Sequence, residues 1–369
     1  MNNYKKYFNG YSTPESRWSR FGPYYAMFPL EFAAKVITNH SEKGDWILDP
    51  FLGRGTSVYA GSILERKGLG IEINPVGWVF SVVKLNPAPI KDVLRRLKEI
   101  CSQKEEYNKK ILELPEFYDY CFCDEVLKFL LSAKDNLNWK EDLVDATLMG
   151  FILVYLHGKI GSNLSNQMQK TKAMGYDYSI NWWIENNYSE PPKINPYEFM
   201  KKKVNWRYKK GRPQTEESEI ELGDSTVILP EIVDDNNRKF SLLLTSPPYY
   251  GVTDYFIDQW LRLWMLGGSA KPNYSSDKHK GRFSSKENYY NLLDTVFSNA
   301  SKVMKEKSAI YVRTDTREFT FKTTVNILKK NFPDHQMKIE GKPYNSRTQT
   351  EIFGQKSNKP GEMDIVLKK

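Results

Sequence analysis

A short apolar strand, a glycine-bearing loop, a helix and a second strand that ends in an acid follow one another near the start of this 369-residue chain. Residues 44–57 read GDWILDPFLGRGTS, and residues 69–75 read LGIEINP. The apolar run Trp46–Leu48 predicts a buried strand, and Val58–Leu64 predicts the helix after the loop. This order is typical of two parallel strands joined by a crossover helix, and it predicts the opening of a nucleotide-binding α/β sheet.

The loop and the acid indicate what such a sheet would bind. Glycines at positions 53 and 55 let the backbone approach a ligand closely. Glu72, which lies 23 residues after Asp49, stands where a carboxylate can accept hydrogen bonds from ribose hydroxyls. No third glycine follows at the spacing of a dinucleotide fingerprint, and no Gly-Lys-Ser/Thr ends the loop as in a P-loop. The competing interpretation is a tight strand-to-helix turn with a surface glutamate.

A second motif follows another apolar run. Phe240–Leu244 leads directly into Thr245-Ser246-Pro247-Pro248-Tyr249. Two adjacent prolines fix φ and remove two backbone donors, so the Ser246 hydroxyl and the Pro247 carbonyl are held as acceptors beside the flat ring of Tyr249. An exocyclic amino group on a planar base requires such an arrangement, with two acceptors for its N–H bonds and an aromatic face for its ring. The competing interpretation is a proline turn that closes a strand.

Together, DPFLGRGT and TSPPY resemble the amino-methyltransferases of DNA, which use S-adenosylmethionine to methylate N4 of cytosine or N6 of adenine. The resemblance covers roughly half the chain and implies a Rossmann-like class I methyltransferase sheet, double-stranded DNA as the partner and a base flipped out of the duplex. The residues that match the family's cofactor-binding positions are Phe28, Pro29, Asp49, Pro50, Phe51, Gly53, Gly55, Thr56, Glu72 and Asp224. Those that match its catalytic motif are Ser246, Pro247, Pro248 and Tyr249.

The sequence departs from the family in two respects. Position 54 is Arg where the family usually has a small residue, and Arg54 could pair with the cofactor carboxylate, pair with a DNA phosphate or point to solvent. The cofactor loop precedes the catalytic motif by about 190 residues, so the permutation class stays open. Serine at position 246, rather than Asp or Asn, favours N4 of cytosine. The alternatives are an N6-adenine DNA methyltransferase, an RNA guanine-N2 methyltransferase and a catalytically silent DNA-binding subunit.

Residues 91–216 lack the alternation of strands and helices. They predict a largely helical insertion that divides the catalytic domain into residues 1–90 and 217–369. Between residues 159 and 212, eleven Lys or Arg stand against four acids, among many Tyr and Trp. We therefore expect this region to recognise the target, with the cations on phosphates. Amides that could read base edges are those of Asn163, Asn166, Gln167 and Gln169.

Several residues outside the two motifs are further candidates. The stretch Tyr250–Leu266 predicts a loop that becomes an amphipathic helix, in which Asp254, Tyr255 and Asp258 could line the base pocket, with capping and core packing as the alternative. Arg313 ends a later strand and could face cofactor or DNA. Arg347–Thr350 could touch DNA or form a surface turn.

The composition also bears on the charge of the expected partner and on the expected cellular compartment. The net charge of +9 suits a polyanionic partner. No apolar run reaches the length of a membrane span, the first residues do not resemble a secretory signal, and three cysteines fit a reducing cytoplasm. Neither the histidines nor Cys121 and Cys123 form a metal-binding pattern, so no metal is expected. The resemblance also implies a restriction or phage-defence system, with a cognate subunit of that system as a partner.

Overall fold

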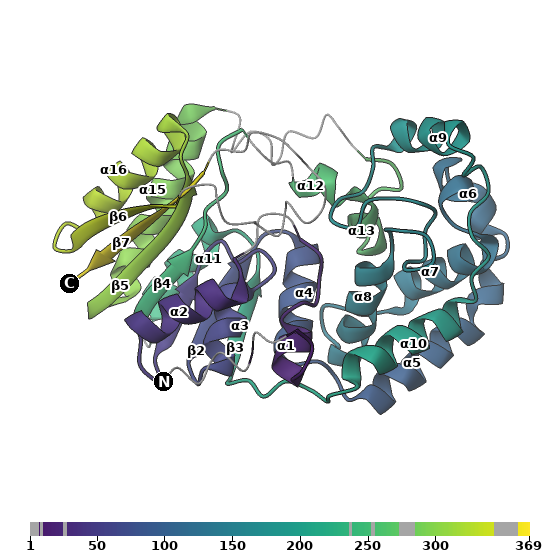
Figure 1. Cartoon of the computed structure of the whole chain (residues 1–369), viewed down its shortest axis with the longest axis horizontal. Coiled ribbons are helices and arrows are strands. Elements are labelled where there is room, and N and C mark those ends of the chain that lie inside the picture. Colours follow the sequence, from purple (N-terminus) through teal and green to yellow (C-terminus); the bar gives the residue numbers. More distant parts are fainter. Residues whose placement is uncertain are drawn as a thin grey trace.

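The computed structural model describes residues 7, 10–24, 28–235, 238–251, 255–272, 285–342 and 361–369, without the side chains of residues 235, 255 and 342 (Figure 1). A strand-rich part and an all-helical part lie side by side. The two parts are in contact where helix α4 (Pro75–Leu85) packs against helix α8 (Leu143–Tyr155) of the helical part.

A seven-stranded sheet of order β3-β2-β1-β4-β5-β7-β6 organises the strand-rich part. Strands β1 to β5 pair in parallel, and β7 runs antiparallel to both of its neighbours. The chain order reverses between β1 and β4, and ligands of open α/β sheets bind outside the carboxyl ends of strands at such a point. The strands are β1 Trp46–Asp49, β2 Lys67–Glu72, β3 Ser218–Leu222, β4 Phe240–Thr245, β5 Met304–Asp315, β6 Gln336–Lys342 and β7 Glu362–Lys368. This is the Rossmann-like methyltransferase sheet that the sequence predicts.

Helices cover both faces of the sheet. Strands β1 and β4 are therefore almost continuously apolar, as parallel strands buried on two sides must be. One face carries α2, α3 and α4, and the other carries α11, α15 and α16. Their bounds are α2 Leu30–His40, α3 Thr56–Ile63, α4 Pro75–Leu85, α11 Ser225–Asp235, α15 Lys286–Val303 and α16 Glu318–Asn331.

Local sequence signals explain where two of these helices begin. Helix α2 begins at Leu30, two residues later than the apolar pattern predicts, with Pro29 as its N-cap residue. Strand β2 ends at Glu72 because Asn74 and Pro75 begin α4: the Asn74 side chain accepts from the amide of Val76, and proline occupies the first helical position. The positions of these boundaries bring Glu72 to the carboxyl edge of the sheet.

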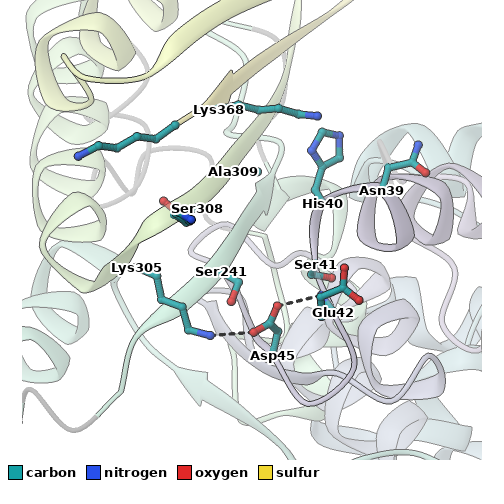
Figure 2. A pocket seen from close by; sticks show the side chains of 12 residues that line it. Asn39, His40, Ser41, Glu42, Asp45, Ser241, Lys305, Ser308, Ala309 and Lys368 are labelled. Carbon is teal, nitrogen blue, oxygen red and sulfur yellow. Dashed lines mark hydrogen bonds and ion pairs between the residues drawn. The ribbon is translucent and has the colours of Figure 1, made fainter.

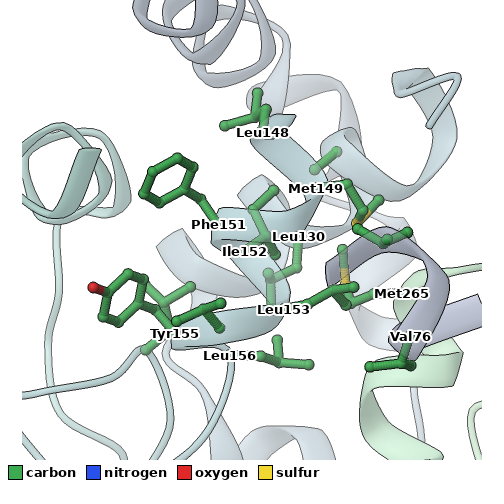
Figure 3. Close-up of a cluster of buried hydrophobic side chains, with 14 of the residues drawn as sticks. Val76, Leu130, Leu148, Met149, Phe151, Ile152, Leu153, Tyr155, Leu156 and Met265 are labelled. Atoms are coloured by element: carbon green, nitrogen blue, oxygen red, sulfur yellow. The ribbon is translucent and has the colours of Figure 1, made fainter. Parts of the chain in front are cut away.

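Residues 91–216 contribute no strand to the described sheet. Their main helix, α8, is buried along nearly its whole length. Figure 3 shows its side chains packed against Leu130, Val76 of α4 and Met265. The hydrophobic core is therefore continuous between the insertion and the sheet-bearing part, while the boundaries at 90 and 217 stay a prediction. The elements are α5 Ile90–Ser102, η2 Lys104–Tyr107, η3 Lys110–Glu113, α6 Phe117–Cys121, α7 Asp124–Asn136, α8 Leu143–Tyr155, α9 Tyr176–Glu185 and α10 Pro196–Tyr208.

Three further helices complete the described chain. Helix α1, Pro14–Trp18, packs against α10. The expected single helix before Leu266 is instead two short ones, α12 Tyr255–Asp258 and α13 Trp260–Met265, separated by Gln259. No described helix combines the length and apolar character needed to cross a lipid bilayer.

Candidate active site

A buried carboxylate joins the two motifs. Asp49 ends β1, and its Oδ1 accepts hydrogen bonds from the Thr245 hydroxyl at 2.6 Å and from the Phe51 amide at 3.1 Å. The Ser57 hydroxyl donates to its Oδ2. Burial raises the pKa of Asp49 to about 6, against these hydrogen bonds. Asp49 therefore ties the cofactor loop and the first turn of α3 to the end of the strand that carries TSPPY.

The glycine loop lies directly against α4. Gly53 and Gly55 have φ of +59° and +75°, in the left-handed region that favours glycine. A Cβ on Gly55 would lie 2.6 Å from the Ser81 hydroxyl oxygen, and a Cβ on Gly77 would lie 2.6 Å from the Gly53 carbonyl oxygen. The glycines at 55 and 77 thus permit a close approach of loop and helix. Gly53 is different, because only the Tyr24 ring, at 3.7 Å, comes near its missing Cβ.

Glu72, at the end of the neighbouring strand β2, hydrogen-bonds to the glycine loop. Its two carboxylate oxygens accept from the amides of Gly53 at 2.6 Å and Asn74 at 2.8 Å. Burial raises its pKa to about 8, partly offset by these two hydrogen bonds. The Glu72 carbonyl accepts from the Gly223 amide at 3.0 Å, which brings Asp224 to the same edge of the sheet. The Asp224 carboxylate accepts from the Thr226 amide and hydroxyl at the start of α11.

The donors and acceptors around this loop fit an adenosine-type cofactor. A carboxylate has about four lone-pair directions, and backbone amides take two of those of Glu72, which leaves room for ribose hydroxyls. The Thr56 hydroxyl, buried at the start of α3, has no hydrogen-bond partner among the described residues. Pro50 and Phe51 act through the backbone: the Pro50 carbonyl accepts from the Ser225 hydroxyl, and the Phe51 amide holds Asp49.

The start of α2 lies near the end of β5. Phe28 and Pro29 precede this helix, and the Phe28 ring packs on the Phe32 ring at 5.3 Å between centroids. The Arg313 guanidinium lies 3.6 Å from the centroid of Phe32 and forms a two-point ion pair with the buried Asp364, at 2.7 and 3.0 Å. Arg313 therefore lies against α2 and β7, 5.7 Å from the centroid of Phe28, and the expectation that it faces cofactor or DNA stays a prediction.

The catalytic motif leaves β4 as a turn without regular secondary structure. The Ser246 and Tyr249 hydroxyls approach each other to 3.5 Å. The Tyr289 hydroxyl, from the fully buried side chain of a residue on α15, donates to the Pro248 carbonyl at 3.0 Å. Sequence reasoning missed Tyr289, because this contact joins residues 41 positions apart and follows from sheet topology rather than from a local pattern.

Arg54 points into the protein. Its guanidinium is buried and donates to the Gly22 carbonyl at 3.0 Å, and the Lys84 ammonium donates to the Arg54 carbonyl. Burial lowers the pKa of Arg54 to about 10, with Arg20 and Arg207 nearby. Of the interpretations left open by the sequence, exposure to solvent is therefore wrong. The side chain instead ties the cofactor loop to the segment after α1.

The amides expected to read base edges are mostly internal. Asn166 is fully buried, and its side chain donates to the carbonyls of Tyr120 at 2.9 Å and Tyr188 at 2.7 Å. Asn163 is also buried and donates to the Lys159 carbonyl. The expectation is wrong for these two residues, because their buried amides donate to backbone carbonyls of α6, of the segment after α9 and of the loop between α8 and α9. The Gln167 amide oxygen accepts from the Ile160 amide, and Gln169 is exposed.

That same loop, residues 158–175, is fastened to the chain after the catalytic motif. The fully buried Arg262 of α13 donates to the carbonyls of Leu153 at 2.9 Å and Lys170 at 2.7 Å. The Ala173 amide donates to the Asp258 carbonyl at 3.0 Å. The loop therefore lies beside α12 and α13. In Figure 1 α12 lies near the top of the molecule, whereas α10, with its row of lysines, lies at the bottom right.

Three expectations fall outside what the structure describes. Asp254 and Arg347–Thr350 lie outside the described residues, as does the side chain of Tyr255.

A hollow of about 390 Å³ lies at the opposite, amino edge of the sheet, and Figure 2 shows it lined by the Asp45–Lys305 ion pair and by His40. It contains none of the motif residues. Among the described residues no group of three or more His, Cys, Asp or Glu is placed to hold a metal ion.

A family model and several curated proteins match this chain. The family model described as DNA methylase matches residues 2–76. Type II methyltransferase M.AvaI of Nostoc sp. is 27% identical over 280 residues, which is 69% of this chain and 55% of that protein. M.BsoBI of Geobacillus stearothermophilus is 26% identical over 65% of this chain and 52% of its own length, and M.MvaI of Kocuria varians is 26% identical over 59% and 51%. The chain thus spans about half the length of these relatives.

Fold, loop and motif define a class I methyltransferase sheet with its ligand-binding edge at the ends of β1, β2 and β4. Together with the matches, they show that the chain is similar to the amino-methyltransferases of DNA, without a choice between the cytosine and adenine subtypes. The family's cofactor is S-adenosylmethionine, which the buried Glu72 carboxylate suits, as does the Thr56 hydroxyl, which has no partner within the described part of the chain.

Proposed function

We propose that this chain is a site-specific DNA methyltransferase that transfers a methyl group from S-adenosylmethionine to the exocyclic amino group of a flipped base, with N4 of cytosine as the target. One observation carries the proposal. The TSPPY turn and the DPFLGRGT loop emerge at adjacent strand ends and are joined by the 2.6 Å hydrogen bond from Thr245 to Asp49. A methyl donor in the loop and a base in the turn would therefore meet at one edge.

The side chains at this edge have separate roles in the proposal. Glu72 accepts from the ribose hydroxyls of the cofactor, and Asp224 lies at the next strand end toward the adenine amino group. S-adenosylmethionine, when bound, supplies a methyl group already activated by its sulfonium. The remaining task of the protein is to position and polarise the base.

The catalytic turn performs that task with two acceptors and a ring. The Ser246 hydroxyl and the Pro247 carbonyl accept from the two N–H bonds of the base amino group. These hydrogen bonds favour a tetrahedral nitrogen whose lone pair is less delocalised into the base. The Tyr249 ring stacks on the base and offsets part of the unstacking cost of flipping. Pro247 is buried, and no hydrogen bond to its carbonyl is present among the described residues.

We place duplex DNA along the loop of residues 158–175. This loop carries Lys159, Lys170 and Lys172 and no acid, and Arg262 and Ala173 fasten it beside the segment that follows the catalytic turn. Lysines meet phosphates and give salt-dependent affinity without base specificity. The Type II names of the relatives make modification beside a cognate restriction nuclease the corresponding physiological proposal.

The test is nucleoside mass spectrometry of DNA from cells that express the chain, with Ser246→Ala and Tyr249→Ala as controls. We expect N4-methylcytosine that is absent with either variant. N6-methyladenine instead would retain the amino-methyltransferase and overturn the choice of base. Folded protein that binds S-adenosylhomocysteine but modifies no deoxynucleoside, in cells or as purified protein on duplex DNA, would contradict DNA methylation by this chain alone.

A further inference from the structure

The catalytic turn receives a hydrogen bond from a donor outside itself. Pro247 and Pro248 have no amide hydrogen, so neither can donate a hydrogen bond that would close the turn. Two described hydrogen bonds tie it to other elements: the Thr245–Asp49 hydrogen bond at its start and the 3.0 Å hydrogen bond from the Tyr289 hydroxyl to the Pro248 carbonyl at its centre. The second contact lies one residue before the ring that is proposed to stack on the base.

The Tyr289 ring is itself held firmly. Its side chain is fully buried four residues into α15, whose first turn is capped by Ser285. It packs in a cluster of three rings, with centroids 5.7 Å from Tyr250 and 5.9 Å from Phe319, and Tyr250 and Phe319 lie 4.9 Å apart. Because Tyr250 directly follows the motif, this cluster holds the catalytic turn by its next ring as well as by its carbonyl.

The acceptor of this hydrogen bond has a geometric consequence. The Pro248 carbonyl belongs to the planar peptide group that joins Pro248 to Tyr249. Restraining the oxygen restrains that plane, and the plane together with φ of Tyr249 sets the direction in which the Tyr249 side chain leaves the backbone. No hydrogen bond to the preceding carbonyl, of Pro247, is present among the described residues.

We propose that Tyr289 is a positioning residue for methyl transfer: its hydroxyl locks the Pro248–Tyr249 peptide so that the Tyr249 ring and the Pro247 carbonyl face the base together. The inference rests on the proposed function. Burial raises the pKa of Tyr289, and the neighbouring Asp315 raises it further. The phenol therefore stays protonated, as a donor must, over the pH range in which the protein would be assayed.

The test compares Tyr289→Phe with Tyr208→Phe. Tyr208 is the matched control, since it is a buried tyrosine whose hydroxyl donates to the Ala88 carbonyl at 2.6 Å in the helical part, away from the motif. We expect Y289F to lower kcat about tenfold, the effect of one hydrogen bond made to the catalytic turn. KM for duplex DNA and Kd for S-adenosylhomocysteine should change by less than about twofold, and Y208F should leave all three constants near those of the wild type.

Hydrogen–deuterium exchange of residues 245–251 supplies a readout that does not need activity. We expect faster exchange in Y289F than in Y208F at equal global stability. Equal exchange in the two variants, or a loss of kcat in Y289F no larger than in Y208F, would overturn the role of Tyr289. A wild-type chain without methyl transfer would overturn the proposed function, while the exchange comparison would still decide whether Tyr289 holds the turn.

Discussion

At the residue scale, we expect the Glu72 carboxylate, as the proposed acceptor for the ribose hydroxyls, to make cofactor affinity depend on pH. Burial raises its pKa to about 8, with the charge of Asp49 adding to the effect. Ribose hydroxyls donate to the ionised form, so deprotonation must precede or accompany binding. We therefore expect affinity for S-adenosylhomocysteine to rise with pH, by up to about tenfold per unit below pH 8, and to level off above it.

Calorimetric titration between pH 6 and 9 measures this dependence. Glu72→Gln is the control, because titration of the ligand's own amino group affects both proteins equally. The variant should bind more weakly and show no step that is specific to position 72. An identical pH profile for the two proteins would contradict a ribose-binding role for Glu72.

The two glycines of the loop should differ in their tolerance of a methyl group. A Cβ at position 55 meets the Ser81 hydroxyl oxygen at 2.6 Å, whereas at position 53 the nearest atom is 3.7 Å away. Both φ values are positive, so each alanine costs about 1–2 kcal/mol in backbone strain. Gly55→Ala must also displace Ser81, and we expect it to lose roughly 1 kcal/mol more than Gly53→Ala. Urea unfolding without cofactor measures the difference, and equal losses would contradict this packing.

At the scale of elements, Arg262 fastens the proposed DNA-binding loop to α13. It is fully buried, burial lowers its pKa to about 9, and it donates to the Leu153 and Lys170 carbonyls and to the Gln259 side chain. Arg262→Met leaves these acceptors unpaired, so we expect a loss of about 3 kcal/mol of unfolding free energy and faster proteolysis within residues 158–175.

Arg238→Met is the comparison for that measurement. Arg238 pairs with Glu219 at 2.7 Å, but both side chains are partly exposed. Its removal should lower the free energy of unfolding by less than about 1 kcal/mol. Similar losses of unfolding free energy for the two variants would contradict the role of Arg262 in holding the loop of residues 158–175 against α13.

The elements also divide into those that local sequence predicts and those that it does not. Apolar runs predict β1 and β4 nearly to the residue, because parallel strands buried on two faces need continuous apolar sequence. The cofactor loop and TSPPY were predictable as motifs, and the structure places them together. Helix α15 was missed, although its buried residues recur at helical spacing, and with it the contact of Tyr289 to the catalytic turn.

The insertion shows why polar residues are harder to assign. Asn166 has the side chain that reads adenine, yet its amide hydrogen-bonds the backbone of Tyr120 and Tyr188. The sequence shows that an amide side chain is present, but it does not show which groups that amide hydrogen-bonds. Only the packing of the loop between α8 and α9 decides whether that amide faces DNA or the interior. The same argument applies to Arg313, whose partner, Asp364, lies 51 residues away on a neighbouring strand.

At the scale of the whole molecule, His40 links stability to pH. Burial lowers its pKa from 6.5 to about 4, Lys368 lowers it further, and Glu340 opposes the shift. The unfolded chain therefore binds more protons than the folded protein between pH 6.5 and 4. The contribution of His40 to the unfolding free energy is complete above about pH 6.5 and is lost as the pH falls toward 4.

His40→Asn removes this contribution. Asp49 and Glu72 have raised pKa values and act in the opposite sense, so only the difference between wild type and variant isolates the histidine. We expect the stability difference, from urea unfolding at several pH values, to change between pH 6.5 and 4 and to be flat above that interval. A difference that is constant throughout would contradict the depressed pKa.

The path of DNA over the molecule can be read from salt dependence. Two groups of lysines are candidates for contact with DNA. Lys159 and Lys172 lie in the loop beside α12, whereas Lys202 lies on α10 and Lys209 directly follows that helix, at the bottom right of Figure 1. Each phosphate contact contributes a slope of about −0.9 to log K against log salt concentration. We expect Lys159→Ala and Lys172→Ala each to make the slope shallower by about that amount, and Lys202→Ala and Lys209→Ala to leave it unchanged. Fluorescence anisotropy with a duplex at several salt concentrations measures these slopes. The reverse pattern would move the DNA to α10 and would separate the bound duplex from the edge where Ser246 and Tyr249 lie.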